Sequence, residues 1–481
     1  MPNILSKRIR DMKTAYDFFH KYLSENISDA DTLERMRHVI SEFAARAPKM
    51  IVMKCIDGRV HGSKAKGYPP TTIRFGRTDG NKVSLDKGNF WYWNRIDRAV
   101  KDAHFNTPET PAVFIAFMHH SARGLGCSSH NSNNAEAFKS IQAQITEVRK
   151  VYQEQELFVM GGDTNTDIMA ETLIFPENLR INSEDIIRYC NLKKPRDVFH
   201  EFFLGNRIDD VATSRNVGHK LPEQLLDGIN PEIFTNFQTC LNLENYLLRE
   251  ITTTFNKDRG DLKRIIRPDI LDYIFITLDK AQIPGTLVGP VLYQIIWNIT
   301  YALYQINLIS TLGPEALDRH LDHAEELVCY GDGFETLPRN KSVLVKTGRG
   351  DDVDALNVAK MVLDNNRKRY RQEHKLLVHI NIEVNGEMMT WDDFNDNVGS
   401  RILTMRRNVD YVFGMDVAIL TTYSYRDQKR FYPVIISKND PRIVYRADVI
   451  SEINSSLKFS NISLKAQEMH YKASYIGNMN L

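Results

Sequence analysis

Short apolar runs alternate with helical patterns in the first half of the chain, and two of these runs end in polar residues. The first run, at residues 50–53, leads into the cluster Cys55-x-Asp57-x-Arg59. The second, at residues 113–118, leads into His119 and His120. Such runs are typical of buried parallel strands. Further strands are predicted at 72–75 and 157–161, and helices at 89–103 and 135–152. This alternation indicates an α/β fold with a mainly parallel sheet, whose ligands bind at the carboxyl ends of the strands.

The sequence predicts four regions along the chain. Residues 1–48 have a helical pattern, and the α/β unit described above covers 49–220. A mainly helical connecting region covers 221–337, and a second α/β unit covers 338–481. Within the second unit we expect helices at 353–370 and 391–406 and strands at 376–382 and 411–420. Its residues 375–385 can be laid over 49–59, and 417–424 over 113–120. The second unit is then either a decayed copy of the first or a chance likeness between apolar strands.

One uncharged segment, between Lys280 and Glu315, is long enough to cross a bilayer. Amide side chains interrupt its apolar sequence, at Gln294, Asn298, Gln305 and Asn307. No cluster of lysine or arginine marks one flank as cytoplasmic. A buried core or interface helix therefore explains the segment better than a membrane span.

The composition narrows the classes of partner and compartment. The 481 residues carry a formal net charge of +1, which gives no electrostatic reason to expect binding to nucleic acid or lipid. The five cysteines are odd in number and irregularly spaced, so they predict a reducing compartment rather than a disulfide framework. The first residues lack an apolar run of signal-peptide length. We therefore expect a cytoplasmic protein.

Residue types that bind metals follow both apolar runs. Cys55 and Cys127 offer two thiolates. Because strand side chains alternate between faces, only one of His119 and His120 is expected to join them. We predict His120, with His119 as the alternative. Two thiolates and one imidazole suit Zn2+ and leave the fourth tetrahedral position for water, which is typical of a catalytic site.

This arrangement resembles the β-carbonic anhydrases, in which Cys, His and Cys hold zinc beside an Asp-Arg pair that matches Asp57 and Arg59. The usual family pattern, Gly-His-x-x-Cys, keeps two residues between the histidine and the second cysteine. Here six residues separate His120 from Cys127, and His119 stands in place of the glycine. The longer gap, the two-lobed layout with a second copy that lacks the metal ligands, the helical N-terminal region and the segment Gly162–Asp167 look more like the carboxysome shell carbonic anhydrase branch. The sequence has no long low-complexity N-terminal stretch of the kind with which that branch is thought to engage RuBisCO.

The resemblance implies a β-carbonic-anhydrase-like mainly parallel sheet with flanking helices, a helical N-terminal segment and a degenerate second α/β copy. It implies a lyase that hydrates CO2 reversibly to bicarbonate by zinc-bound hydroxide. Asp57 would orient that hydroxide and Arg59 would hold Asp57, while His61, His130 or the unliganded member of the His119–His120 pair would carry the proton away. A homodimer or higher homo-oligomer is expected, with the carboxysome shell or RuBisCO as possible partners and the carboxysome as a possible location.

Two other functions fit the same residues. Folds of this kind can hydrolyse related small molecules such as carbon disulfide, which would keep the metal site and change the substrate. The chain can also be a degenerate enzyme that serves as a scaffold without catalysis. Metal content and the product released from each substrate distinguish these functions from CO2 hydration.

Overall fold

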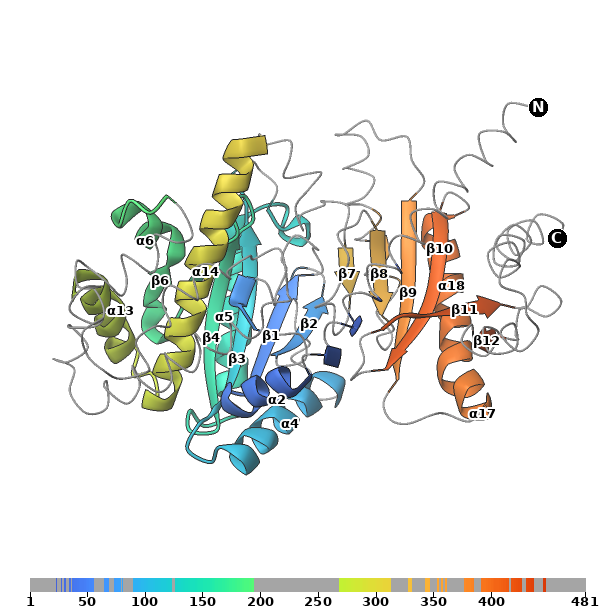
Figure 1. The fold of residues 1–481 in the computed structure, drawn as a ribbon, viewed down its shortest axis with the longest axis horizontal. Helices are drawn as coiled ribbons and strands as arrows, with labels where there is room; N and C mark the ends of the chain where they lie inside the picture. Colours follow the sequence, from blue (N-terminus) through green and yellow to red (C-terminus); the bar gives the residue numbers. More distant parts are fainter. Residues whose placement is uncertain are drawn as a thin grey trace. The chain divides into compact units, whose positions relative to one another are not determined.

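The computed structural model contains two compact α/β units, each built on its own sheet (Figure 1). Helices and strands from α2 to α14 belong to the first unit, and strands β7 to β12 belong to the second. The structure describes residues 37–55, 65–68, 73–78, 80, 90–122, 126–193, 268–312, 328–330, 342–346, 376–384, 391–414, 417–425, 430–436 and 444–446, and single helical positions near 23–35 and 353–360.

The first unit has a six-stranded sheet in the order β2-β1-β3-β4-β5-β6. Its strands are β1 (Met50–Cys55), β2 (Ile73–Thr78), β3 (Ala112–His120), β4 (Leu157–Asn165), β5 (Ala170–Ile174) and β6 (Arg180–Asn182). Its helices include α2 (Arg37–Arg46), α4 (Phe90–Asn106), α5 (Asn134–Arg149), α6 (Ser183–Tyr189), α13 (Pro268–Lys280) and α14 (Gly285–Leu312). Strands β2, β1, β3 and β4 are parallel, whereas β5 and β6 are antiparallel to their neighbours. The predicted α/β class is confirmed as a mixed, mostly parallel sheet with flanking helices.

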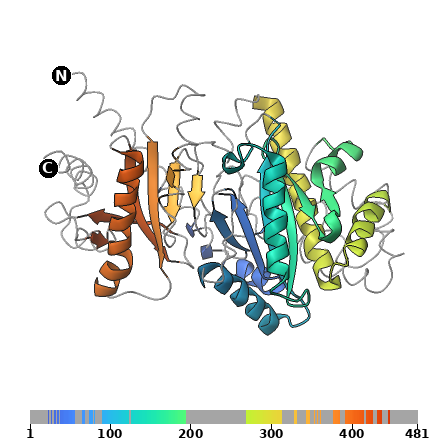
Figure 2. The same cartoon turned by 180° about the vertical axis from the view of Figure 1, so that it is seen from behind.

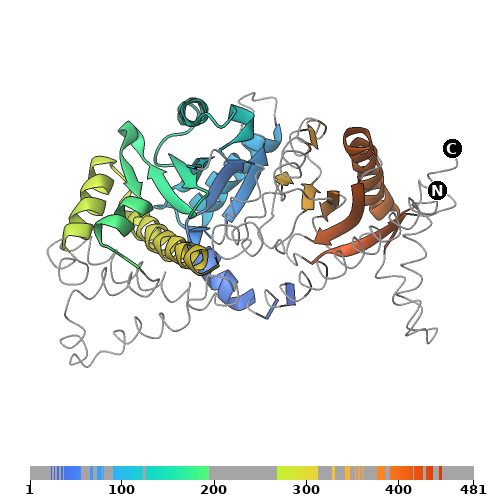
Figure 3. The ribbon, with the colours of Figure 1, turned by 90° about the horizontal axis from the view of Figure 1, so that it is seen from above.

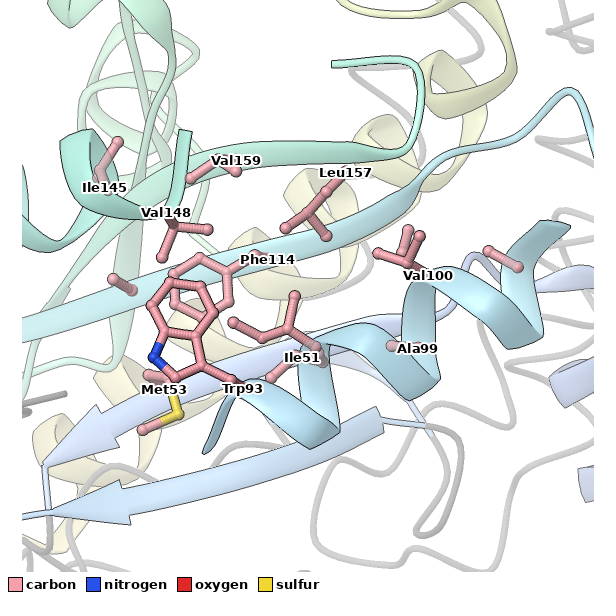
Figure 4. Close-up of a cluster of buried hydrophobic side chains, with 14 of the residues drawn as sticks. Ile51, Met53, Trp93, Ala99, Val100, Phe114, Ile145, Val148, Leu157 and Val159 are labelled. Carbon is pink, nitrogen blue, oxygen red and sulfur yellow. The ribbon is translucent and has the colours of Figure 1, made fainter. Parts of the chain in front are cut away.

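Helices cover both faces of this sheet, with α5 on one side and α14 on the other (Figures 2 and 3). On the α5 side, α4 and α5 pack their apolar stripes against the strands (Figure 4). Ile51, Phe114 and Val159 come from β1, β3 and β4, and each is at most 2% exposed. Because these central strands are buried on both faces, their sequences are continuous apolar runs rather than alternating patterns.

Helix α14 buries three of the four amide side chains that interrupt its apolar sequence, whereas Asn307 is partly exposed. Gln294, Asn298 and Gln305 are each at most 2% exposed. No helix among the described residues is long and apolar enough to cross a membrane. The interpretation of this segment as a buried helix is therefore confirmed. The structure places α13 and α14 in the first unit, whereas the sequence assigned them to a separate connecting region, and it also places α2 there.

The second unit has a six-stranded sheet in the order β12-β11-β10-β9-β8-β7. Its elements are β7 (Val328–Tyr330), β8 (Ser342–Lys346), β9 (Leu376–Val384), α17 (Trp391–Phe394), a π-helical turn (Asn395–Gly399), α18 (Ser400–Phe413), β10 (Val417–Tyr425), β11 (Tyr432–Ile436) and β12 (Val444–Arg446). The predicted strand at 411–420 is corrected, because residues 411–413 end α18. Val409, Val412 and Phe413 are buried at helical spacing, and Gly414 stops the helix with a φ of 67°.

The two sheets share one topology over four strands. Strands β3, β4, β5 and β6 have 9, 9, 5 and 3 residues, and β9, β10, β11 and β12 have the same lengths. In both sheets a helix connects the first two strands, which pair in parallel in full register, and an antiparallel strand follows. The superposition made from the sequence laid β9 on β1 and β10 on β3, whereas the topology matches β9 with β3 and β10 with β4.

Close packing at Gly162 gives a stability prediction. A Cβ added there would lie 2.2 Å from Phe117 Cε1, and that ring is 1% exposed with Lys66 Nζ 3.7 Å from its centroid. Gly162→Ala should therefore lower the free energy of unfolding by about 1–3 kcal/mol, measured by denaturant titration. The matched control is Gly161→Ala, whose Cβ would meet the movable Ile145 Cδ1 at 3.0 Å. Equal losses in both variants would contradict this account.

Candidate metal centre

Cys55 is the last residue of β1, a strand whose residues are all buried. The pairing of β1 with β3 ends at Met53 and Ala116, whereas the pairing of β1 with β2 continues to Cys55. Cys55 therefore lies just beyond the part of β1 that is paired with β3. At that point the strand register no longer determines which β3 side chain faces the thiol.

Cys127 lies in the turn that connects β3 to α5. Its carbonyl oxygen accepts hydrogen bonds from the backbone N–H groups of His130, at 3.1 Å, and Ser132, at 2.9 Å. Asn133 then caps α5, and its side-chain oxygen accepts hydrogen bonds from the first backbone N–H groups of the helix. These contacts fix the turn, and Cys127 is 4% exposed.

The structure brings Cys55, His119 and Cys127 together. One ligand atom from each lies within 4.8 Å of the other two, and all three residues are buried. The two Sγ atoms are 3.8 Å apart. Among the described residues, this is the one group of three or more histidine, cysteine or acidic side chains with that spacing. The strand position that corresponds to His119 in the second unit is occupied by Glu383.

The histidine in this group differs from the one predicted. His120 is directed to Asp163 on β4, with Nδ1 2.8 Å from the carboxylate Oδ2, and it is 29% exposed against 2% for His119. The hydrogen bond to Asp163 raises the pKa of His120. The alternation of side chains along β3 correctly placed His119 and His120 in different surroundings. Which of the two lies beside Cys55, however, depends on where β1 stops pairing with β3. The third ligand of the candidate site is therefore corrected from His120 to His119.

The segment after β4 stabilises the end of β3. Asp167 accepts hydrogen bonds from Ser121 Oγ and from the backbone N–H of Ala122, both at 2.7 Å. Thr166 donates its backbone N–H to the carbonyl oxygen of His120 at 2.9 Å. The sequence motif Asp163–Asp167 therefore fixes the backbone on which both histidines lie. Asp57 and Arg59, the predicted residues beside the metal, lie outside the described residues, as does His61.

The three side chains fit a zinc ion by type and by spacing. Two Zn–S bonds of about 2.3 Å at a tetrahedral angle would place the sulfurs about 3.8 Å apart, which equals the observed Sγ–Sγ distance. The two thiols also contact each other. The hydrogen bond with Cys127 and burial raise the pKa of Cys55 well above its ordinary value, although His119 acts to lower it. A cation would instead favour the deprotonated thiolates, because metal binding releases the protons of its cysteine ligands.

Comparisons with known proteins do not assign this site. No model of a known protein family matches the sequence, and no curated protein matches it either. The geometry and the chemistry of the donor set are therefore the basis for any functional conclusion.

Proposed function

We propose that the protein is a zinc-dependent carbonic anhydrase of the β-carbonic anhydrase superfamily, which converts CO2 and water reversibly to bicarbonate and a proton. The observation that supports this proposal is the convergence of Cys55, His119 and Cys127 at the carboxyl ends of neighbouring parallel strands and the turn that follows. Three protein ligands leave one tetrahedral position open, which separates a catalytic zinc site from a closed structural one.

The metal would supply the nucleophile at neutral pH, because bound Zn2+ lowers the pKa of its water from 15.7 to about 7. The chain's own residues set the conditions for this chemistry. Cys55 and Cys127 bring two negative charges, which would nearly neutralise the ion and make it a weaker acid than three imidazoles would. Both cysteines are buried, with Cys55 5% and Cys127 4% exposed.

The family resemblance implies two further tasks, one for Asp57 and one for Arg59. Asp57 would accept a hydrogen bond from the attacking oxygen and orient its lone pair toward the carbon of CO2. Arg59 would hold Asp57 in its ionised form through paired hydrogen bonds. His120, as the unliganded member of the histidine pair, is one of the candidate groups for carrying the proton to solvent. Asp163 holds its Nδ1 and thereby fixes the orientation of the ring.

The finer assignments within this proposal rest on the sequence resemblance. They are membership of the carboxysome shell branch, assembly as a homodimer or higher homo-oligomer, and contact with the carboxysome shell or RuBisCO. The matching topology of the two sheets supports the two-lobed layout on which the branch assignment depends. Size measurement in solution tests the assembly independently of the chemistry.

The proposed activity is tested on the purified full chain by elemental analysis and by the rate of proton release from CO2. We expect one zinc ion per chain, loss of CO2 hydration after chelation, and recovery when Zn2+ is added back. Sulfide release from carbon disulfide, without CO2 hydration, would replace the proposed substrate. A zinc content near zero that Zn2+ addition does not raise would rule out the metalloenzyme and favour a scaffold.

A further inference from the structure

A buried ion cluster lies in the first unit beside the candidate metal centre. Glu171 on β5 pairs with two lysines: its Oε2 is 2.5 Å from Lys66 Nζ, and its Oε1 is 3.5 Å from Lys54 Nζ. The side chains are 0% exposed for both lysines and 2% for Glu171. Charged side chains are almost never buried to this extent unless they are paired.

Helix α14 and strand β3 complete the surroundings of the cluster. Gln294 Nε2 donates a hydrogen bond to Glu171 Oε2 at 3.4 Å, and Asn298 Oδ1 accepts one from the Glu171 backbone N–H at 2.7 Å. Phe117 on β3 lies under both ammonium groups, with its centroid 3.7 Å from Lys66 Nζ and 4.9 Å from Lys54 Nζ. Two of the amides that interrupt α14, Gln294 and Asn298, therefore bind the side chain and the backbone of Glu171.

The two lysines lie on either side of one short stretch of sequence. Lys54 immediately precedes Cys55, and Lys66 follows eleven residues later, so the residues between them include Cys55, Asp57 and Arg59. Asn298 reinforces the far end, because its Nδ2 donates hydrogen bonds to the carbonyl oxygens of Ala65 and Met169, both at 3.1 Å. A single carboxylate, one oxygen for each lysine, thus binds both ends of the stretch that supplies the first metal ligand.

Glu171 and the two lysines favour one another's charged forms. Burial alone would raise the pKa of Glu171, but the positive charges of Lys66 and Lys54 outweigh it and lower that pKa overall. Burial lowers the pKa of Lys66, and Glu171 opposes this effect. Replacing buried ions by well-packed apolar side chains of similar volume is often neutral or stabilising for a fold. Stability alone therefore does not explain three charges at this place.

We propose that Glu171 is a positioning residue for the metal centre: by pairing with Lys54 and Lys66, it fixes the carboxyl end of β1 and so sets the position of the Cys55 thiol relative to His119. His119 is two residues beyond Phe117 on β3, so the same cluster contacts the strand that supplies the histidine ligand. This inference rests on the proposed metal site, and it assigns the cluster a role in metal affinity rather than in the chemical step.

The test measures Zn2+ affinity by competition with a chromophoric chelator, and the ligand geometry from the absorption bands of bound Co2+. The triple variant Lys54→Met, Lys66→Met and Glu171→Leu replaces the ions with apolar side chains of similar volume. We expect it to fold, to bind Zn2+ about 10–100-fold more weakly than the wild type, and to show a changed Co2+ spectrum. Glu171→Asp keeps all three charges but is too short to contact both lysines. It should also weaken Zn2+ binding, and it provides the same test if the triple variant does not fold.

A core variant separates positioning from general loss of stability. Leu157→Ala removes a side chain that is 1% exposed at the amino end of β4, the end opposite the metal centre, and should leave Zn2+ affinity and the Co2+ spectrum unchanged. Folded cluster variants with wild-type affinity and spectrum would overturn the positioning role and leave the proposed function intact. A wild-type protein that binds neither ion would refute the proposed function itself, and this inference with it.

Discussion

Replacing Cys55, His119 or Cys127 with alanine, one at a time, should reduce the metal content from one ion per chain to nearly zero. Apparent zinc-binding free energies of about 10–16 kcal/mol for four-ligand sites correspond to roughly 2.5–4 kcal/mol per ligand. Losing one ligand should therefore weaken binding by a factor of about 10²–10³. CO2 hydration should fall to the uncatalysed rate. Elemental analysis after dialysis against a weak chelator, together with stopped-flow proton release, measures both effects.

The matched control for His119→Ala is His120→Ala, its neighbour on the same strand. His120 faces Asp163 rather than the thiols, so this variant should retain one metal ion per chain. A reversal, with metal lost in His120→Ala and kept in His119→Ala, would restore the ligand set predicted from the sequence and contradict the structure. Retention of full metal content and activity by Cys55→Ala would end the proposal of a metal centre here.

The sequence predicted the four parallel strands of the first unit, because their burial leaves a local signal, but it did not predict the antiparallel strands β5 and β6. Strands β1, β3 and β4 begin with apolar runs and carry polar residues at their carboxyl ends. Strand β10 was harder to place. An apolar helix end and an apolar strand follow each other within residues 409–425, and only Gly414 marks the boundary between them.

The candidate site was predictable in its chemistry but not in its third ligand. Cysteine, histidine and cysteine at strand ends suggest a metal from residue type alone. The choice of His119 depends on tertiary structure, because it requires knowing that β1 stops pairing with β3 at Met53. The ion pairs of Glu171 with Lys54 and Lys66 could not be predicted either, because they too depend on tertiary structure. These residues come from three separate segments, and charged residues without structural context are assigned to the surface.

A buried cluster of hydrogen-bonded polar side chains in the second unit occupies the sheet position at which Phe117 packs against Gly162 in the first unit. Phe117 and Gly162 correspond in sheet position to Asn381 and Thr422. Thr422 Oγ1 donates to Asn381 Oδ1 at 2.8 Å and contacts His379 Nε2 at 2.6 Å, and all three residues are at most 3% exposed. Phe431 packs edge-on against the imidazole. These contacts therefore hold a titratable ring in a fully buried position.

His379 should make the second unit sensitive to acid. Burial lowers the pKa of His379 to about 3, whereas an unfolded histidine has a pKa of about 6.5. Between these values the unfolded state binds more protons than the folded state, so stability rises with pH across this window and falls as the pH decreases. The slope approaches 1.4 kcal/mol per pH unit, and the total loss between pH 6.5 and 3 is about 4–5 kcal/mol.

His379→Gln should remove this loss, because a neutral amide can bond to Thr422 but cannot take up a proton. Hydrogen exchange of peptides from β9 and β10 measures the opening free energy of this sheet. Comparing variant and wild type at each pH cancels the intrinsic pH dependence of exchange. The two proteins should diverge progressively below pH 6, with the wild type opening more readily. Parallel curves down to pH 4 would mean that the folded state accepts the proton on His379 without cost, and the enclosed neutral imidazole would not be the source of acid sensitivity.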